Sequence, residues 1–131
     1  MALKTYLLLI VMGLALALLA ILVFGIAPGV VSLQLYALLL AYTACLYTGA
    51  ALSEGRPLWL SIEVGVSTVV FACASLGVWQ SSRWLAAGYL VHGLWDLCHH
   101  PKRIRTRVVD WFPPICATFD FAVAGFIAVR Y

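Results

Sequence analysis

The sequence predicts an all-α polytopic membrane protein, a single membrane domain built as a bundle of five transmembrane helices. Its 131 residues are 65% hydrophobic and 10% charged, with a mean hydropathy of +1.05. Soluble domains are about 45–50% apolar and about 25% charged, so a soluble chain of this length could not bury its apolar side chains. The apolar runs are continuous, whereas strands of a membrane barrel alternate apolar and polar residues. Helices in lipid are therefore the expected fold.

Five apolar segments approach or reach the length needed to cross a membrane, which is about 20 residues for a helix. Short stretches that contain charged or turn-forming residues separate them. The fourth segment is the shortest and the most polar. The expected spans are residues 6–25, 30–52, 58–79, 84–99 and 113–129.

The first segment is expected to be a span that packs outside a core of the other four helices or against another protein. Its apolar stretch is longer than the 7–15 residues typical of a secretory signal peptide. No polar side chain occurs between Tyr6 and Gly25. Gly13 and Ala17 are small enough to allow another helix to approach closely. Ala27-Pro28-Gly29 then predicts a tight turn into the second span.

The remaining boundaries are also marked in the sequence. Residues 53–57 separate the second and third spans, and residues 80–83 separate the third and fourth. His99-His100-Pro101 is typical of a helix end, since histidine suits the C-terminal dipole and proline stops a helix. His100 is therefore expected at the membrane interface. Pro113 and Pro114 fit the first turn of the fifth helix, where no amide partner is lost.

The distribution of basic residues predicts the orientation. With five spans, the N-terminus and the second and fourth loops share one side, and the other side has only Arg83 and Arg130. Loops rich in Lys and Arg stay in the cytoplasm, so the N-terminus is expected inside and the C-terminus outside. The basic residues of the inner side are Lys4, Arg56, Lys102, Arg103, Arg105 and Arg107.

The fourth span carries most of the titratable residues inside the predicted membrane segments. At about 100° per residue, His92, Asp96 and His99 fall within roughly 60° of one another on the helix. With a rise of about 1.5 Å per residue, Asp96, Glu63 and Asp120 lie about 6, 8 and 10 Å from the cytoplasmic ends of their helices. The sequence therefore predicts a polar intramembrane cluster in the cytoplasmic half, with tyrosine hydroxyls as further partners. Its expected members are Glu63, His92, Asp96, His99 and Asp120, with Tyr42, Tyr47 and Tyr89 nearby.

Four interpretations of this cluster stay open. It could be a structural network of hydrogen bonds between helices. It could bind a divalent metal (zinc, iron or manganese) through His92, His99 and Asp96, because imidazole and carboxylate together suit these ions. It could also be a proton or cation pathway. Haem is less favoured, because His92 and His99 share one helix and a second haem ligand would have to come from another chain. The sequence assigns no catalytic residue.

The remaining features indicate contact with lipid. Lys102, Arg103, Arg105 and Arg107 form a basic loop that is expected to anchor to anionic lipid headgroups, each worth about 1 kcal/mol near such a surface. Nucleic acid is not an expected partner.

Four cysteines lie in four different predicted helices without a C-x-x-C spacing, so a disulfide framework is not expected.

One region resembles a known group of proteins. The block His92-Gly-Leu-Trp-Asp96-Leu-Cys-His-His100, followed by an aromatic-Pro-Pro segment that ends in Phe119-Asp120, is similar to that of a family of small uncharacterised bacterial integral membrane proteins. The resemblance covers roughly the C-terminal third. It implies a bacterial inner-membrane location and groups His92, Asp96, His99 and Asp120 in one motif, but it implies no activity.

These observations predict a small multi-pass protein of a bacterial inner membrane. The favoured function is an accessory subunit of a larger membrane complex, with other membrane subunits or a second copy of the chain as partners. The alternatives are a membrane metalloenzyme that acts on a lipid-soluble substrate, and a proton or cation pathway.

Overall fold

The chain folds into five helices, as the computed structural model describes for residues 3–100, 104 and 106–131. Of these residues, 86% are helical and none forms a strand. The all-α class is therefore confirmed, and the helix ends lie within three residues of the expected boundaries. The helices are α1 (Leu3–Phe24), α2 (Gly29–Glu54), α3 (Pro57–Trp79), α4 (Ser82–His99) and α5 (Phe112–Arg130).

Four of these helices, α1, α2, α3 and α5, are long and apolar enough to cross a membrane. The exception is α4, which has 18 residues and includes Arg83, His92, Asp96 and His99. Its length of about 27 Å is close to the thickness of a bilayer core. Its polar residues lower its hydropathy. Apart from Ser82, Arg83 and Tyr89, these residues lie toward its C-terminal end.

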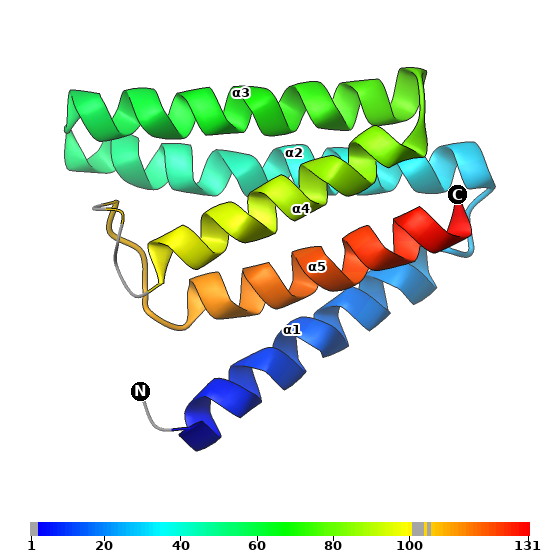
Figure 1. The fold of residues 1–131 in the computed structure, drawn as a ribbon, viewed down its shortest axis with the longest axis horizontal. Coiled ribbons are helices and arrows are strands. Elements are labelled where there is room, and N and C mark those ends of the chain that lie inside the picture. Colours follow the sequence, from blue (N-terminus) through cyan, green and yellow to red (C-terminus); the bar gives the residue numbers. More distant parts are fainter. Residues whose placement is uncertain (1–2, 101–103, 105) are drawn as a thin grey trace.

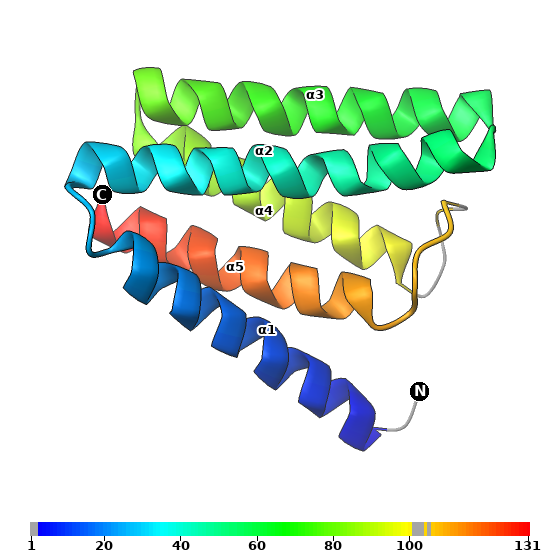
Figure 2. The same ribbon diagram turned by 180° about the vertical axis from the view of Figure 1, so that it is seen from behind.

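The polar helix α4 occupies the inside of the bundle. It packs most extensively against α5 and α3 and also contacts α2. In Figure 1, α2 and α3 run side by side, α4 crosses below them, and α5 and then α1 follow. The opposite view in Figure 2 keeps the same order. A helix with neighbours on several sides can direct polar side chains at protein rather than lipid, which explains why the most polar helix is central.

The helices alternate in direction, so the loops gather at two ends of the bundle (Figure 1). The start of α1, the α2–α3 turn and the α4–α5 segment lie at one end, called here the Arg56 end. The C-terminus and the α1–α2 and α3–α4 turns lie at the other, the Arg83 end. The loops that were expected on the same side of the membrane therefore lie at the same end of the bundle.

Helix α1 is peripheral and packs chiefly on α5. A Cβ atom on Gly13 would lie 2.6 Å from the Ile115 carbonyl oxygen and 2.8 Å from Thr118 Cβ. Glycine therefore lets the two backbones meet at this point, and Ala17 is buried one turn later. Most other side chains of α1 are exposed, as expected for a helix outside the core.

The core lies between α2, α3, α4 and α5. Its largest fully buried apolar side chains include Tyr36, Leu40, Leu85 and Ile127. Tyr89 is also fully buried, and its hydroxyl donates to the carbonyl oxygen of Tyr36 at 2.8 Å. This bond satisfies the tyrosine hydroxyl and joins α4 to α2.

Candidate functional site

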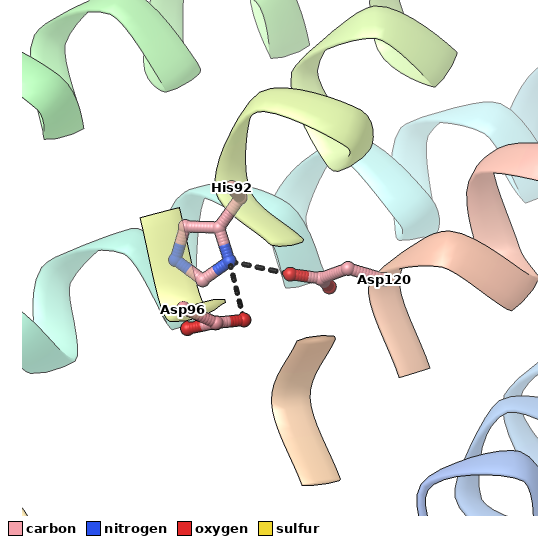
Figure 3. A group of neighbouring side chains, drawn as sticks. All are labelled: His92, Asp96 and Asp120. Carbon is pink, nitrogen blue, oxygen red and sulfur yellow. Dashed lines mark hydrogen bonds and ion pairs between the residues drawn. The ribbon is translucent and has the colours of Figure 1, made fainter. Parts of the chain in front are cut away.

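The first polar group, the His92 cluster, consists of His92 and Asp96 on α4, Asp120 on α5 and Tyr47 on α2. His92 Nδ1 lies 2.6 Å from Asp120 Oδ2 and 3.8 Å from Asp96 Oδ2. The Tyr47 hydroxyl donates to Asp96 Oδ1 at 2.6 Å. All four side chains are at most 2% exposed. Figure 3 shows Nδ1 facing both carboxylates, with the other ring nitrogen turned away from them.

Close helix packing places Asp120 in this cluster. A Cβ on Gly93 would lie 3.2 Å from Asp120 Cβ and 3.1 Å from the ring of Phe121. Gly93 follows His92 directly, so the α4–α5 contact is tight at the level where the imidazole meets the carboxylate. A larger residue at this position would press directly on Asp120.

The second polar group, the Glu63 cluster, consists of Glu63 on α3, Trp95 and His99 on α4, and Thr106. Glu63 Oε1 is 3.0 Å from His99 Nε2 and accepts from the Thr106 hydroxyl at 2.7 Å. Glu63 Oε2 accepts from the Trp95 indole at 2.9 Å. The segment after α4 therefore reaches into the bundle at Thr106 and covers this cluster from the Arg56 end.

The hydrogen bonds of the Glu63 cluster define its charge. His99 Nδ1 lies 3.0 Å from the Trp95 carbonyl oxygen, which can only accept, so Nδ1 must carry a proton. The Glu63 carboxylate already accepts from Trp95 and Thr106. The third contact, between Glu63 Oε1 and His99 Nε2, holds one proton, and all of these contacts are satisfied with that proton on either atom. The cluster is thus a buried Glu–His pair with its hydrogen bonds complete and with no net charge.

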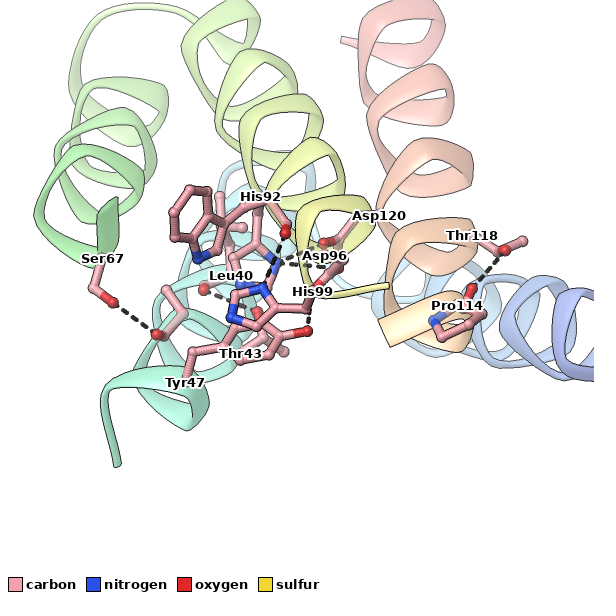
Figure 4. A network of polar contacts seen from close by, with 12 residues as sticks. Leu40, Thr43, Tyr47, Ser67, His92, Asp96, His99, Pro114, Thr118 and Asp120 are labelled. Atoms are coloured by element: carbon pink, nitrogen blue, oxygen red, sulfur yellow. Dashed lines mark hydrogen bonds and ion pairs between the residues drawn. The ribbon is translucent and has the colours of Figure 1, made fainter. Parts of the chain in front are cut away.

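The two clusters touch through Tyr47. Its hydroxyl binds Asp96, and its ring stacks on the His99 ring with centroids 4.0 Å apart and planes 16° apart. Figure 4 shows Tyr47 reaching from α2 between His99 and Asp96. One tyrosine therefore contributes a hydrogen bond to the His92 cluster and an aromatic contact to the Glu63 cluster.

All five residues expected in the polar cluster lie in these two groups and are buried. The metal-ligand set expected from the sequence, however, is not the set that comes together. Both His99 ring nitrogens face Trp95 and Glu63. Within the described residues, the group whose ligand atoms all lie within 4.8 Å of one another is His92, Asp96 and Asp120. The third residue of the candidate metal-binding group is therefore Asp120, whereas the sequence suggested His99.

Two atoms of the His92 cluster are left without hydrogen-bond partners in the described part of the chain. They are His92 Nε2 and Asp96 Oδ2, both fully shielded. A buried polar atom without a partner costs about 1–3 kcal/mol, and such atoms are rare in native proteins. This open binding capacity distinguishes the His92 cluster from the Glu63 cluster.

A largely apolar groove leads to the His92 cluster. It has a volume of about 380 Å³ and lies between α1, α2 and α5. Nine of its twelve lining residues have apolar or thiol side chains, and the other three are Thr43, His92 and Asp120. The lining residues from α1 are Leu16, Leu19, Ala20, Val23 and Phe24. The groove thus runs along an apolar helix and reaches a buried histidine–aspartate pair.

Some partners in the site were not expected from the sequence. Thr106 has no obvious signal, because it is a lone hydroxyl residue within a basic loop. Trp95 was not among the expected members of the cluster, but its indole donates to Glu63. Of the three tyrosines considered, Tyr47 joins the site, Tyr89 binds Tyr36, and Tyr42 is exposed.

The basic loop lies mostly outside the described residues, which exclude Lys102, Arg103 and Arg105. Arg107 is described and has an exposed side chain, and its backbone N–H donates to Glu54. His100 caps the C-terminus of α4. All four cysteines are free, in agreement with the expected absence of a disulfide framework.

Comparison with known proteins places the chain in a family. A model described as "Family of unknown function (DUF6010)" matches residues 8–130. The chain belongs to this family. The match extends over both clusters and the groove, well beyond the C-terminal block that suggested an uncharacterised family. No curated protein and no solved structure matches the chain.

Proposed function

We propose that this family member is a five-span membrane protein that binds a lipid-soluble molecule in the groove between α1, α2 and α5, with the polar group of that molecule at His92. The observation that carries the proposal is the groove itself. Its walls are apolar, and His92 and Asp120 are among the residues that line it. Ligand pockets combine apolar walls with a few placed polar groups, and this groove has both.

The apolar walls suit an aliphatic or isoprenoid chain. A volume of about 380 Å³ lies within the range of about 300–1,000 Å³ of small-molecule sites. One wall is α1, a helix without a polar side chain after Tyr6. A molecule dissolved in the bilayer could enter past this helix without crossing water.

The polar end suits a hydroxyl, carbonyl or carboxyl group. Asp120 accepts the Nδ1 proton of His92 and so orients the imidazole, which is the usual role of a carboxylate behind a working histidine. Nε2 then remains available as the second hydrogen-bonding atom of the ring. Such a pair can bind the polar group of a ligand, and it can exchange a proton with that group if the protein is an enzyme.

In the membrane arrangement that goes with this function, α4 crosses the membrane together with α1, α2, α3 and α5, and the Arg56 end lies in the cytoplasm. Lys4, Arg56 and Arg107 belong to that end, whereas Arg83 and Arg130 belong to the other end, and Lys102, Arg103 and Arg105 follow α4 in the sequence. By the positive-inside rule this favours an N-terminus in the cytoplasm of a bacterial inner membrane. The loop arginines and lysine then lie where anionic headgroups can bind them.

The expected role as an accessory subunit stays a prediction, and the groove is compatible with it, since a subunit can also hold a lipid-soluble molecule. Purification of the chain from its native membrane in a mild detergent tests it directly. A partner retained at a fixed ratio would support the role, whereas a chain that migrates alone would count against it.

Photolabelling tests ligand binding. The probe is a sixteen-carbon alcohol with a diazirine in its chain, applied to the full chain in detergent micelles. Label should appear on α1 and α5 residues that line the groove and should be competed by excess unlabelled alcohol. Ala20→Trp fills the groove and should lower this labelling about fivefold or more.

Leu18→Trp is the matched control. Leu18 lies on the same helix, is 56% exposed and does not line the groove, so the variant should label like the parent. Equal, competable labelling of both variants would contradict the proposal, because binding would then not depend on the groove.

A further inference from the structure

We infer that His92, Asp96 and Asp120 hold a divalent transition-metal ion of the zinc type at the inner end of the groove. One ligand atom from each residue lies within 4.8 Å of those of the other two. The residues come from two helices that pack tightly at this level, α4 and α5. This inference does not depend on which molecule occupies the groove.

The measured separations are close to those of a metal site. Ligand atoms around a tetrahedral zinc ion at about 2.1 Å lie about 3.4 Å apart. His92 Nδ1 is 2.6 Å from Asp120 Oδ2 and 3.8 Å from Asp96 Oδ2. To reach this spacing, the Nδ1–Asp120 distance must lengthen and the Nδ1–Asp96 distance must shorten. Both changes need side-chain atoms to move by less than about 1 Å, with no change of helix position.

The second, independent observation is the free oxygen of Asp96. Asp96 is 0% exposed, yet Oδ2 accepts no hydrogen bond from the described residues. This oxygen is on the side of the carboxylate that faces His92. A cation between these groups would give Oδ2 the partner that it lacks.

Charge requires a proton or a cation at this place. Two ionised aspartates in an apolar interior are strongly unfavourable, because burial removes their hydration and they repel each other, so they take up either a proton or a metal ion. A divalent ion that replaces the proton on His92 Nδ1, with the neutral imidazole protonated on Nε2 instead, makes the three-residue site neutral overall. The neighbouring Glu63 and His99 share one proton and contribute no net charge.

The donor set indicates the class of ion. One imidazole and two carboxylates suit zinc, manganese or iron, and three protein ligands leave a position open for water or substrate. Tyr47 holds the other oxygen of Asp96, and such outer hydrogen bonds fix ligand orientation in metal sites. The open position would place the metal within reach of a polar group bound in the groove.

Metal titration tests the site. The full chain, stripped with EDTA in detergent and dialysed, is titrated with Zn²⁺ in one experiment and with Co²⁺, followed by visible absorption, in another. About one ion should bind per chain and remain bound on a chelating resin. His92→Gln, Asp96→Asn and Asp120→Asn should each weaken Zn²⁺ binding by about 100-fold.

The matched controls are His100→Gln and Glu54→Gln, which remove the same side-chain types outside the site. Both should bind Zn²⁺ like the parent. Loss of binding in these controls, undiminished binding in Asp96→Asn and Asp120→Asn, or no ion retained by the parent would each overturn the site.

Zinc-edge X-ray absorption of the parent keeps the test independent of how the variants fold. The expected first shell contains nitrogen and oxygen with one imidazole and no sulfur. A sulfur ligand would contradict the site, because the groove is also lined by Cys116. Photolabelling carried out in EDTA reports on the groove alone, so failure of the metal site and failure of ligand binding are told apart.

Discussion

The His92 and Glu63 clusters are built from the same residue types but differ in how completely their hydrogen bonds are made. Glu63 receives the Trp95 indole, the Thr106 hydroxyl and the His99 ring, and both His99 nitrogens have partners. In the His92 cluster, His92 Nε2 and Asp96 Oδ2 have none within the described residues. The clusters meet at Tyr47 and both are almost fully buried, so their difference does not arise from burial.

This difference separates two uses of polar residues inside a helical bundle. A buried pair with saturated hydrogen bonds fixes helices and a loop relative to each other, since every donor and acceptor is bound within the protein. An unsaturated group costs free energy in the folded state and offers binding capacity in return. Substitutions in the Glu63 cluster should therefore affect stability, and substitutions of His92, Asp96 and Asp120 should affect binding.

The largest effect is expected for Glu63→Gln. One amide oxygen cannot accept from Trp95, Thr106 and His99 together, so at least one hydrogen bond to the Glu63 carboxylate would be lost. The variant should lose about 3 kcal/mol of unfolding free energy, measured by unfolding in micelles of rising SDS content. Glu54→Gln, nearer the bundle end, should lose much less. If Glu63→Gln is as stable as the parent, the Glu63 cluster does not have the stabilising role that distinguishes it from the His92 cluster.

Tyr47→Phe should have an intermediate effect. It removes the hydroxyl that binds Asp96 Oδ1 and keeps the ring on His99. The loss should be about 1–2 kcal/mol, because a buried carboxylate oxygen loses its donor. Tyr42→Phe is the control on the same helix, since Tyr42 is exposed and should change nothing. Equal effects of the two variants in SDS unfolding would show that the hydroxyl at Tyr47 is not a structural bond.

Thr106→Val should cost about 1 kcal/mol, the value of one hydrogen bond to Glu63. The shape is kept, so the packing of the loop should not change. Amide hydrogen exchange of residues 104–111 should become faster, since the bond joins this segment to α3. Unchanged exchange would show that the loop is held without Thr106.

The smallest stability effect is expected for Asp96→Asn. The asparagine oxygen can still accept from Tyr47, and the amide replaces an oxygen that had no partner. The unfolding free energy should change by less than about 1 kcal/mol, while metal binding is lost. A loss as large as that of Glu63→Gln would make the two clusters alike and remove the basis for assigning them different roles.

The fold follows from the sequence because apolar length and turn residues define membrane helices. The convergence of Asp96 and Asp120 was also predictable, since helix rise alone places them at similar depth. Which carboxylate each histidine contacts was not predictable. His92 and His99 share a face, but seven residues separate them by about 10 Å along the axis, so they meet different neighbours. His92 meets Asp120 on α5 and His99 meets Glu63 on α3. Thr106 could not be found, since a loop path has no periodicity.

The packing of α1 on α5 also has a consequence for the order of assembly. The first helix to be synthesised has its main partner in the fifth, and it touches α2 only slightly. During synthesis α1 must therefore wait in lipid until α5 arrives, and α5 also brings Asp120. The groove and its polar end are completed in the same step, because both need residues of α5.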